Sequence, residues 1–445
     1  MASQVSPGVV IRERDLSTGV LTGVSGLRAG FASSFRSGPV GKITNIGSER
    51  ELLNTFGAPA EANAADWLVA GEFLRYGGQL AVVRVATGVL NATLDGSAVL
   101  VGSKSDYDAG AGSSEKFIAR TAGADGNNLY VVVVDKGPDF TIVKTGHGLS
   151  VGGTYTDDGA VGHEVVEVVD ANTVRIIQGT AAPTPASGDT STAFSNSMWN
   201  ATTIGSTGLT YKEIGPRPGT SAFASERYVS YDEMHVAVID TSTNTVVERM
   251  TYLSKISDAK SAEGSSIYWK DYVNEFSGYI YASALTSAEF TTLGSDPGAA
   301  VASYGATSAA PISIARILKT AGGSLSGGTD DYAYTTGEIS AAYTLFQDTE
   351  ETSLDFVLMG GSMGSEADTL VKAGAVAAVA NTRKDCIAFI SPFNGNQVAT
   401  SGGSALTPAL QLENTIDYFS SIGSSSYVVK DSGIKYTYDR FNDKY

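Results

Sequence analysis

Apolar residues at helical spacing mark the first structured part of the chain. They follow Ser48 and Glu51, which fit a capping box, so a short helix is predicted that ends just after Phe56. A second helix is predicted over residues 62–76, and the apolar, β-branched run over 80–85 predicts a strand. This stretch is therefore expected to be an α-then-β unit.

The same alternation of helix and strand returns after Gly337. Apolar periodicity predicts a helix over 339–346, a strand over 354–359, a helix over 366–383, a strand over 386–390 and a helix over 407–422. Thr407 and Pro408 supply an N-cap and a first-turn proline for the last of these helices. These residues are expected to belong with the first α/β unit.

Between these stretches the pattern changes to short apolar runs separated by turn residues. The runs predicted to be strands lie at 117–119, 129–134, 165–169 and 174–177. Residues 234–240 and 246–253 predict two more strands joined as a hairpin. His147 and His163 fall in the glycine-rich part and are expected to be exposed.

These patterns predict a mixed α/β and β fold with several domains, in which an α/β domain is interrupted by inserted β-rich outer domains and preceded by an extended N-terminal arm. The expected segments are the arm at 1–20, the discontinuous α/β domain at 21–88 and 304–423, a β-rich outer insertion at 89–200, a middle α+β domain at 201–303, and the start of a C-terminal domain at 424–445. The inserted modules are expected to close on themselves.

Both ends of the chain carry candidate strands without an obvious local partner. The N-terminal candidates are Val9, Val10, Ile11, Arg12 and Glu13, and the C-terminal candidates are Tyr427, Val428, Val429, Ile434 and Tyr436. The C-terminal set is predicted to form a hairpin, and an isolated hairpin is only marginally stable in water. Strand addition from neighbouring chains would complete both ends and link subunits through backbone hydrogen bonds. The alternative is that the two ends pair within one chain, and the sequence favours neither.

Composition and charge narrow the class of protein. A length of 445 residues predicts about three domains. Charged residues at 17% and hydrophobic residues at 42% exclude a disordered acidic protein. The net charge of -17 argues against a general affinity for nucleic acid, and the acidic excess lies between two near-neutral ends, residues 1–88 and 424–445. No apolar stretch approaches the ~18 residues needed to span a bilayer, so no membrane insertion is expected.

The candidates for chemistry each have a structural explanation that the sequence favours. The glycine-rich run 359–364 lies between a strand and a helix, as a phosphate-binding loop would, but no Lys-Ser/Thr pair follows it and the helix starts with acidic residues. Asp240 in a predicted turn, His235 at a strand start and the single Cys386 lack the partners that metal binding or nucleophilic catalysis requires. We therefore expect no catalytic site, no metal site and no cofactor, with a nucleotide-binding hydrolase as the distant alternative.

Several short motifs, in a fixed order, carry a family resemblance. They are Ser6-Pro7-Gly8-Val9 with Arg12-Glu13, Asn54-Thr55-Phe56-Gly57, Phe73-Leu74-Arg75-Tyr76-Gly77, Val82-Val83-Arg84, Gly215-Pro216-Arg217-Pro218-Gly219-Thr220-Ser221, Asp232-Glu233-Met234-His235, Leu253-Ser254-Lys255, Arg383-Lys384-Asp385-Cys386 with Ile390-Ser391-Pro392, and Tyr438-Asp439-Arg440-Phe441-Asn442-Asp443. Over nearly its whole length the chain resembles the tail sheath protein of contractile-tailed bacteriophages.

The resemblance implies a helical stack of hexameric rings around an inner tube, assembled in the host cytoplasm and located in the virion tail. It implies that the stack shortens when the baseplate triggers it and drives the tube through the host envelope. The implied partners are further copies of the chain, the tail tube protein, and baseplate and tail terminator proteins, with no nucleic acid and no direct membrane insertion. A sheath of a tail-derived bacteriocin or secretion system is the alternative.

One departure from the family concerns the C-terminus. Family members of this subtype usually continue well beyond the region of Asn442 into a C-terminal domain, whereas this chain stops at Tyr445. We therefore expect that the sequence is a truncated form and that residues 424–445 begin a domain whose remainder is missing.

Overall fold

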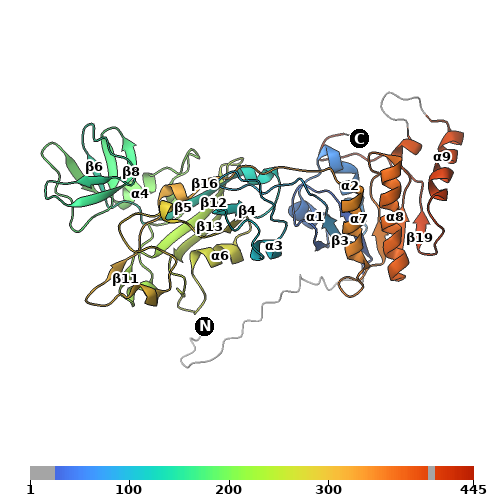
Figure 1. Ribbon diagram of the computed structural model, residues 1–445. Helices are drawn as coiled ribbons and strands as arrows, with labels where there is room; N and C mark the ends of the chain where they lie inside the picture. Colours follow the sequence, from blue (N-terminus) through green and yellow to red (C-terminus); the bar gives the residue numbers. More distant parts are fainter. Residues whose placement is uncertain (1–25, 399–405, 445) are drawn as a thin grey trace. The chain divides into compact units, whose positions relative to one another are not determined.

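The computed structural model describes residues 26–398 and 406–444 and divides them into two compact units (Figure 1). Unit 1 takes the chain up to Thr87 and again from Asp331, and unit 2 is formed by residues 88–330. Unit 2 is therefore inserted into the chain of unit 1. The predicted class, mixed α/β and β with more than one domain, is confirmed.

Unit 1 is built around a six-stranded sheet with the order β19-β18-β17-β1-β3-β2. Its strands are β1 (Arg28–Ser33), β2 (Ile43–Ile46), β3 (Gln79–Arg84), β17 (Phe356–Leu358), β18 (Ile387–Ile390) and β19 (Val428–Lys430). All neighbours run parallel except β2 and β3, which are antiparallel. The neighbouring strands β1 and β3 are buried almost along their whole length, as expected where a sheet is covered on both faces.

Helices cover the two faces of this sheet. The helices of unit 1 are α1 (Glu49–Phe56), α2 (Ala64–Arg75), α7 (Thr336–Thr344), α8 (Glu366–Arg383) and α9 (Pro408–Ser420). Phe56 of α1 and Trp67 of α2 pack with Phe31 on one face. Tyr343 of α7 and Val376 of α8 pack with Ala32, whose side chain points to the other face. The result is a three-layer α/β unit.

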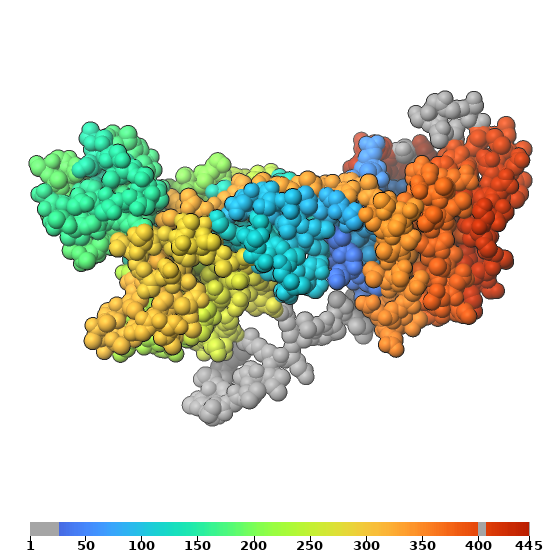
Figure 2. Space-filling model, viewed as in Figure 1, coloured from blue at the N-terminus to red at the C-terminus, as the bar shows by residue number. Residues whose placement is uncertain are grey.

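The predicted helix signals act as expected. The Ser48 side chain accepts a hydrogen bond from the Glu51 backbone N–H at 3.2 Å, and Thr407 does the same for Leu410 at 3.3 Å. Helix α8 has the predicted bounds. Helix α9 lies at the surface of the unit (Figure 2), where Leu412 is 62% exposed.

Unit 2 contains two larger sheets and two small ones. The four-stranded sheet, of order β13-β12-β5-β16, comprises β5 (Leu129–Asp135), β12 (Glu233–Asp240), β13 (Thr245–Ser254) and β16 (Gly323–Ser324). The five-stranded sheet, of order β10-β6-β9-β8-β7, comprises β6 (Phe140–Val143), β7 (Thr154–Thr156), β8 (Gly162–Asp170), β9 (Thr173–Ile176) and β10 (Thr190–Ala193). We call residues 140–193 the β-rich module.

The remaining elements of unit 2 are short. Strand β4 (Phe117–Ala119) pairs with β14 (Ile280–Ala282), and β11 (Val229–Ser230) pairs with β15 (Ile312–Ser313). The helices are α3 (Lys104–Asp108), α4 (Asn196–Ala201), α5 (Ala222–Ser225) and α6 (Trp269–Phe276). Within the residues described, no helix is long and apolar enough to cross a membrane.

The boundaries inside the chain differ from those expected from the sequence. Residues 304–330 belong to unit 2, since β15 pairs with β11 and β16 with β5. The segment 89–200 does not close on itself, because β5 pairs with β12 and β4 with β14. Within it, the β-rich module forms a sheet of its own. Residues 428–430 add a strand to the six-stranded sheet. The start of a C-terminal domain at 424–445 stays a prediction.

Candidate functional site

Three of the motifs that carry the resemblance meet in one buried polar network of unit 2. The carboxylate of Asp232 is fully buried and accepts hydrogen bonds from the Ser221 backbone N–H at 2.8 Å, the Ser221 hydroxyl at 2.7 Å and the Ser254 hydroxyl at 2.6 Å. The network thus ties the loop 215–221 to the ends of β12 and β13. Buried carboxylates persist in proteins when donors of this kind satisfy them.

A buried ion pair lies beside this network. The Lys255 ammonium and the Asp135 carboxylate are 2.5 Å apart, and both side chains are at most 1% exposed. Asp135 also accepts from the Ile317 backbone N–H at 2.8 Å, and Lys255 donates to the Ala315 carbonyl at 2.9 Å. Burial lowers the pKa of Lys255, while Asp135 opposes that shift. The pair joins β5, β13 and the segment after β15.

His235 is held by the backbone on both sides of its ring. Its Nδ1 accepts from the Tyr252 backbone N–H at 3.0 Å, so Nε2 carries the proton and donates to the Pro216 carbonyl at 2.7 Å. The side chain is fully buried. Both ring nitrogens are therefore hydrogen-bonded to backbone groups, which agrees with the structural role that the sequence favours.

The glycine-rich loop after β17 is occupied by a carboxylate of the protein itself. The Gly361 backbone N–H and the Ser33 hydroxyl each donate to Asp66 at 2.5 Å, and the Lys372 ammonium lies 3.7 Å from Asp66. Burial alone would lower the pKa of Lys372, but Asp66 and Tyr334 raise it above its usual value. Asp66 thus takes the position at which a bound phosphate would be expected.

The other candidates for chemistry are also buried or hydrogen-bonded within the protein. Asp240 accepts from the backbone and hydroxyl of Ser242, as in an ordinary turn. Cys386 is buried, and burial raises the pKa of its thiol. The expected exposure of His163 is wrong, because its side chain is fully buried against Asp157 at 3.4 Å. Across 26–398 and 406–444, no three His, Cys, Asp or Glu side chains are placed to hold a metal ion.

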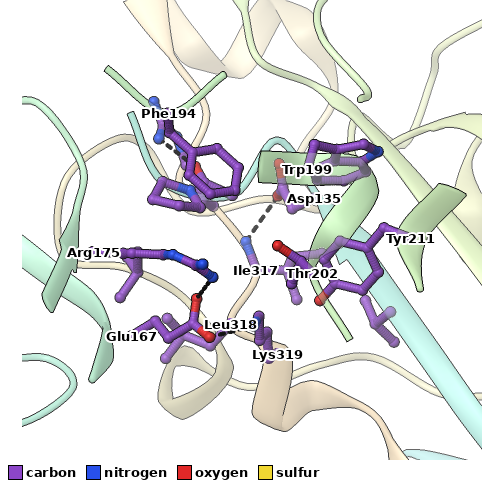
Figure 3. Close-up of a pocket in the computed structure, with 15 residues that line it drawn as sticks. Asp135, Glu167, Arg175, Phe194, Trp199, Thr202, Tyr211, Ile317, Leu318 and Lys319 are labelled. Carbon is purple, nitrogen blue, oxygen red and sulfur yellow. Dashed lines mark hydrogen bonds and ion pairs between the residues drawn. The ribbon is translucent and has the colours of Figure 1, made fainter. Parts of the chain in front are cut away.

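A small pocket of about 30 Å³ lies between the β-rich module and β5 (Figure 3). On one side, Glu167 accepts from Arg175 at 2.7 Å and from Lys319 at 2.6 Å. Burial alone would raise the pKa of Glu167, but Lys319 and Arg175 hold it below its usual value. A more open cavity of about 420 Å³ shares Glu167, Tyr211 and Lys319 with it. The small pocket has room for about two water molecules, well short of an ordinary ligand.

Of the candidate strand residues at the two ends of the chain, the structure describes only the C-terminal set. Val9, Val10, Ile11, Arg12 and Glu13 lie outside the described residues. Val428 and Val429 lie in β19, which pairs in parallel with β18, whereas Tyr427, Ile434 and Tyr436 belong to no strand. The predicted C-terminal hairpin is therefore wrong: the apolar run finds its partner at the edge of the large sheet. A role for these residues between subunits stays a prediction.

Instead of a hairpin, the end of the chain packs on α1 and α2. The Phe441 ring meets Trp67 edge to face, with ring centroids 4.8 Å apart. Arg440 and Lys444 form ion pairs with Glu49 at 2.7 Å and with Glu61 at 2.5 Å. We call residues 439–444 the C-terminal strap.

Four residues join the β-rich module to the rest of unit 2: Arg217, Arg316, Glu164 and Glu167. The sequence points to Arg217 only as part of the 215–221 motif and does not single out the other three. The sequence does give a signal for Arg217. It is the only charged side chain in the run Gly215-Pro216-Arg217-Pro218-Gly219, so it is the residue of this loop that can form charge-assisted hydrogen bonds. The partners that the other three residues bind across the edge of the module are 128 or more positions away in the sequence, so spacing could not reveal them.

Comparisons with known proteins give similarities along the whole chain. No protein-family model matches it. The tail sheath protein of Salmonella phage ViI is 24% identical, with 100% of this chain and 68% of that protein covered. The tail sheath proteins of Vibrio phage KVP40 and Enterobacteria phage T4 are 24% and 23% identical, each over 99% of this chain and over 71% and 70% of their own lengths.

A solved structure adds a further similarity. The sheath tail protein Lin1278 from Listeria innocua aligns with a TM-score of 0.38 and 10% identity, over 90% of this chain and 57% of that chain. The chain thus spans about seven tenths of the curated relatives and little more than half of the solved chain. The expected resemblance to the tail sheath proteins of bacteriophages is confirmed by the three curated relatives over the full length of this chain.

Proposed function

We propose that this chain is a structural subunit of a contractile bacteriophage tail sheath. The observation that carries the proposal is the match to three tail sheath proteins over 99% or more of the chain. The motifs behind the resemblance support it, since residues of three of them form the Asp232 network that holds unit 2 together. The subunit would be a component of the virion tail, assembled in the host cytoplasm.

In this proposal the subunit polymerises as stacked hexameric rings around the tail tube protein and contacts baseplate and tail terminator proteins. Contraction would repack nearly rigid units from an extended to a shortened helix and drive the tube through the host envelope. The second candidate, a sheath of a tail-derived bacteriocin or secretion system, uses the same assembly, and the genes that neighbour this one would separate the two.

Electron microscopy of the purified protein, expressed from its full natural reading frame, tests the assembly. We expect tubes or stacked rings in negative stain at high protein concentration. A full-length protein that stays monomeric at every concentration, while retaining a cooperative thermal transition, would contradict the proposal. Rings without tubes would support subunit association and contradict only the helical stack.

We also propose that the chain is not an enzyme and binds no cofactor. Support comes from the engagement of its candidate groups: His235 binds the backbone through both ring nitrogens, and Asp66 holds the Gly361 loop. Calorimetric titration of the intact protein with ATP and GTP tests this. Saturable binding that a Gly361 substitution abolishes would favour the nucleotide-binding alternative.

A further inference from the structure

The β-rich module joins the rest of unit 2 through two crossings of the chain. The first crossing, Lys136–Asp139, lies between β5 and β6, and the second, Phe194–Ser195, lies between β10 and α4. A domain joined by two short backbone segments is expected to swing unless other contacts restrain it. The contacts at the crossings therefore decide whether the module is tethered or fixed.

Arg217 holds both crossings at once. Its Nε donates to the Lys136 carbonyl at 2.5 Å, its Nη2 donates to the Pro138 carbonyl, and its Nη1 donates to the Phe194 carbonyl at 3.1 Å. The guanidinium carbon also lies 5.2 Å from the centre of the Phe194 ring. One side chain from a loop outside the module thus binds the backbone on either side of it.

Arg316 binds two further groups of the first crossing. It is 7% exposed, and it donates to the Gly137 carbonyl and to the Asp139 carboxylate, each at 2.6 Å. Lys136 reaches the same carboxylate at 3.0 Å. Together the two arginines bind three successive carbonyls of the first crossing, at positions 136, 137 and 138.

A separate contact lies away from the crossings, on β8. The buried carboxylate of Glu164 accepts from the Thr292 backbone N–H at 3.0 Å, the Thr292 hydroxyl at 2.7 Å and the Leu293 backbone N–H at 3.0 Å. These bonds form only while the module is docked, because their donors lie outside it. They therefore report the docked state.

We propose that Arg217 and Arg316 form a clamp that fixes the β-rich module in one orientation within unit 2. A guanidinium group presents five donors in a rigid plane, so Arg217 can bind both crossings together, whereas a lysine ammonium is a single point on a flexible stem. The module has bonds of its own, such as Val165 N–H to the Gly153 carbonyl at 2.8 Å, that do not involve the clamp. The inference concerns unit 2 alone and does not depend on the sheath role.

Hydrogen–deuterium exchange of the full chain tests the clamp with Arg217→Met and Arg217→Lys. We expect exchange at the Thr292 and Leu293 amides to become at least about tenfold faster in both variants, because undocking releases Glu164. Exchange at Val165, inside the module, should stay as in the unmodified protein. The matched control is Arg227→Met, since Arg227 is an exposed arginine over the Phe223 ring, 4.0 Å from its centre.

Three outcomes would overturn the clamp. Unchanged exchange at Thr292 and Leu293 in Arg217→Met would mean that the arginine does not hold the docked state. Faster exchange at Val165 as well would mean that Arg217 is needed for the module to fold. Full protection of the Thr292 and Leu293 amides in Arg217→Lys would mean that a positive charge alone, without the guanidinium geometry, keeps the module docked. Arg316→Met, measured in the same way, should show the same pattern as Arg217→Met.

Discussion

At the scale of single residues, buried arginines hold loops by their backbone carbonyls in both units. Arg84 is fully buried and donates to the carbonyls of Phe35, Arg36 and Gly38 at 2.8 to 2.9 Å. Arg383 donates in the same way to the carbonyls of Phe346, in the short 3-10 turn after α7, and of Asp348 and Thr352 in the loop that follows. Loop carbonyls have no ladder partner, so a buried guanidinium group supplies the donors that water would otherwise supply.

The Asp232 network predicts a large loss of stability on removing its carboxylate. Asp232→Ala leaves the donors of Ser221 and Ser254 without a buried acceptor, which should lower the free energy of unfolding by about 3 kcal/mol or more. Urea denaturation followed by circular dichroism measures this. Glu226→Gln is the matched control, because that side chain is 73% exposed and its change should stay within about 0.5 kcal/mol. Equal effects of the two substitutions would contradict the prediction.

Glu167 and Asp139 predict a dependence of stability on pH. Burial alone would raise both pKa values, but Lys319 and Arg175 lower that of Glu167, and Arg316 and Lys136 lower that of Asp139. A carboxyl group with a lowered folded pKa stabilises the fold above its ordinary value and loses that contribution as the pH falls through the folded value. The ordinary values are 4.5 and 3.8, so the loss should occur below about pH 4.5.

The double variant Glu167→Gln, Asp139→Asn isolates this effect. At pH 7 it should be less stable than the unmodified protein by about 1–3 kcal/mol, since it loses charge-assisted hydrogen bonds. The difference should narrow as the pH falls below about 4.5, because the carboxyls of the unmodified protein become protonated as the pH passes through their lowered pKa values. Urea denaturation at several pH values measures it, and a difference that is independent of pH would refute the assigned ionisation.

The sequence shows which polar residues lie in the short motifs, but not which of them form hydrogen bonds or ion pairs with one another. Asp232 and Ser221 are 11 positions apart, and Lys255 and Asp135 are 120 apart. No spacing rule links residues at such separations, because the intervening chain can take many paths. The motifs were found as separate stretches, and only the fold brings them together.

At the scale of elements, local signals predicted the helices of unit 1, but neither the short helices of unit 2 nor the partners of the strands. The start of α9 follows from Thr407 and Pro408, because a cap bonds residues three positions apart. The partner of β19 is β18, about forty residues earlier in the chain, and nothing local specifies that choice. The sequence of β19 is therefore equally compatible with half of a hairpin and with an edge strand of the large sheet.

The C-terminal strap predicts that one aromatic ring holds it in place. Its ion pairs involve side chains such as Arg440 and Lys444 that are 54% and 41% exposed, and exposed pairs contribute little. Phe441→Ala should therefore weaken docking on Trp67 by about 2 kcal/mol, which corresponds to about thirtyfold faster tryptic cleavage after Arg440, since the protease needs the undocked strap. Ile434→Ala, at a side chain that is 53% exposed, is the control. Equal cleavage rates in the two variants would show that the ion pairs dominate.

At the scale of the whole molecule, the charge of -17 bears on association between copies. Like-charged subunits repel over a distance of about 10 Å at 0.1 M salt. If the chain assembles as proposed, the critical concentration for assembly should fall as sodium chloride is raised from about 0.05 to 0.5 M. Light scattering measures it, with sucrose as the uncharged control. A critical concentration that rises with salt would instead indicate that attraction between opposite charges drives assembly.

The N-terminal residues give the last prediction, which separates folding from assembly. The six-stranded sheet of unit 1 begins at Arg28, so its described strands are all present without residues 1–15. Deleting residues 1–15 should therefore preserve the cooperative thermal transition, while removing the candidate strand Val9 to Glu13 should abolish ordered polymers. Deleting only residues 1–5 leaves that strand and should leave assembly intact. Loss of the thermal transition in the longer deletion would mean that these residues belong to the core of their own subunit, and polymers formed without them would mean that other surfaces join the copies.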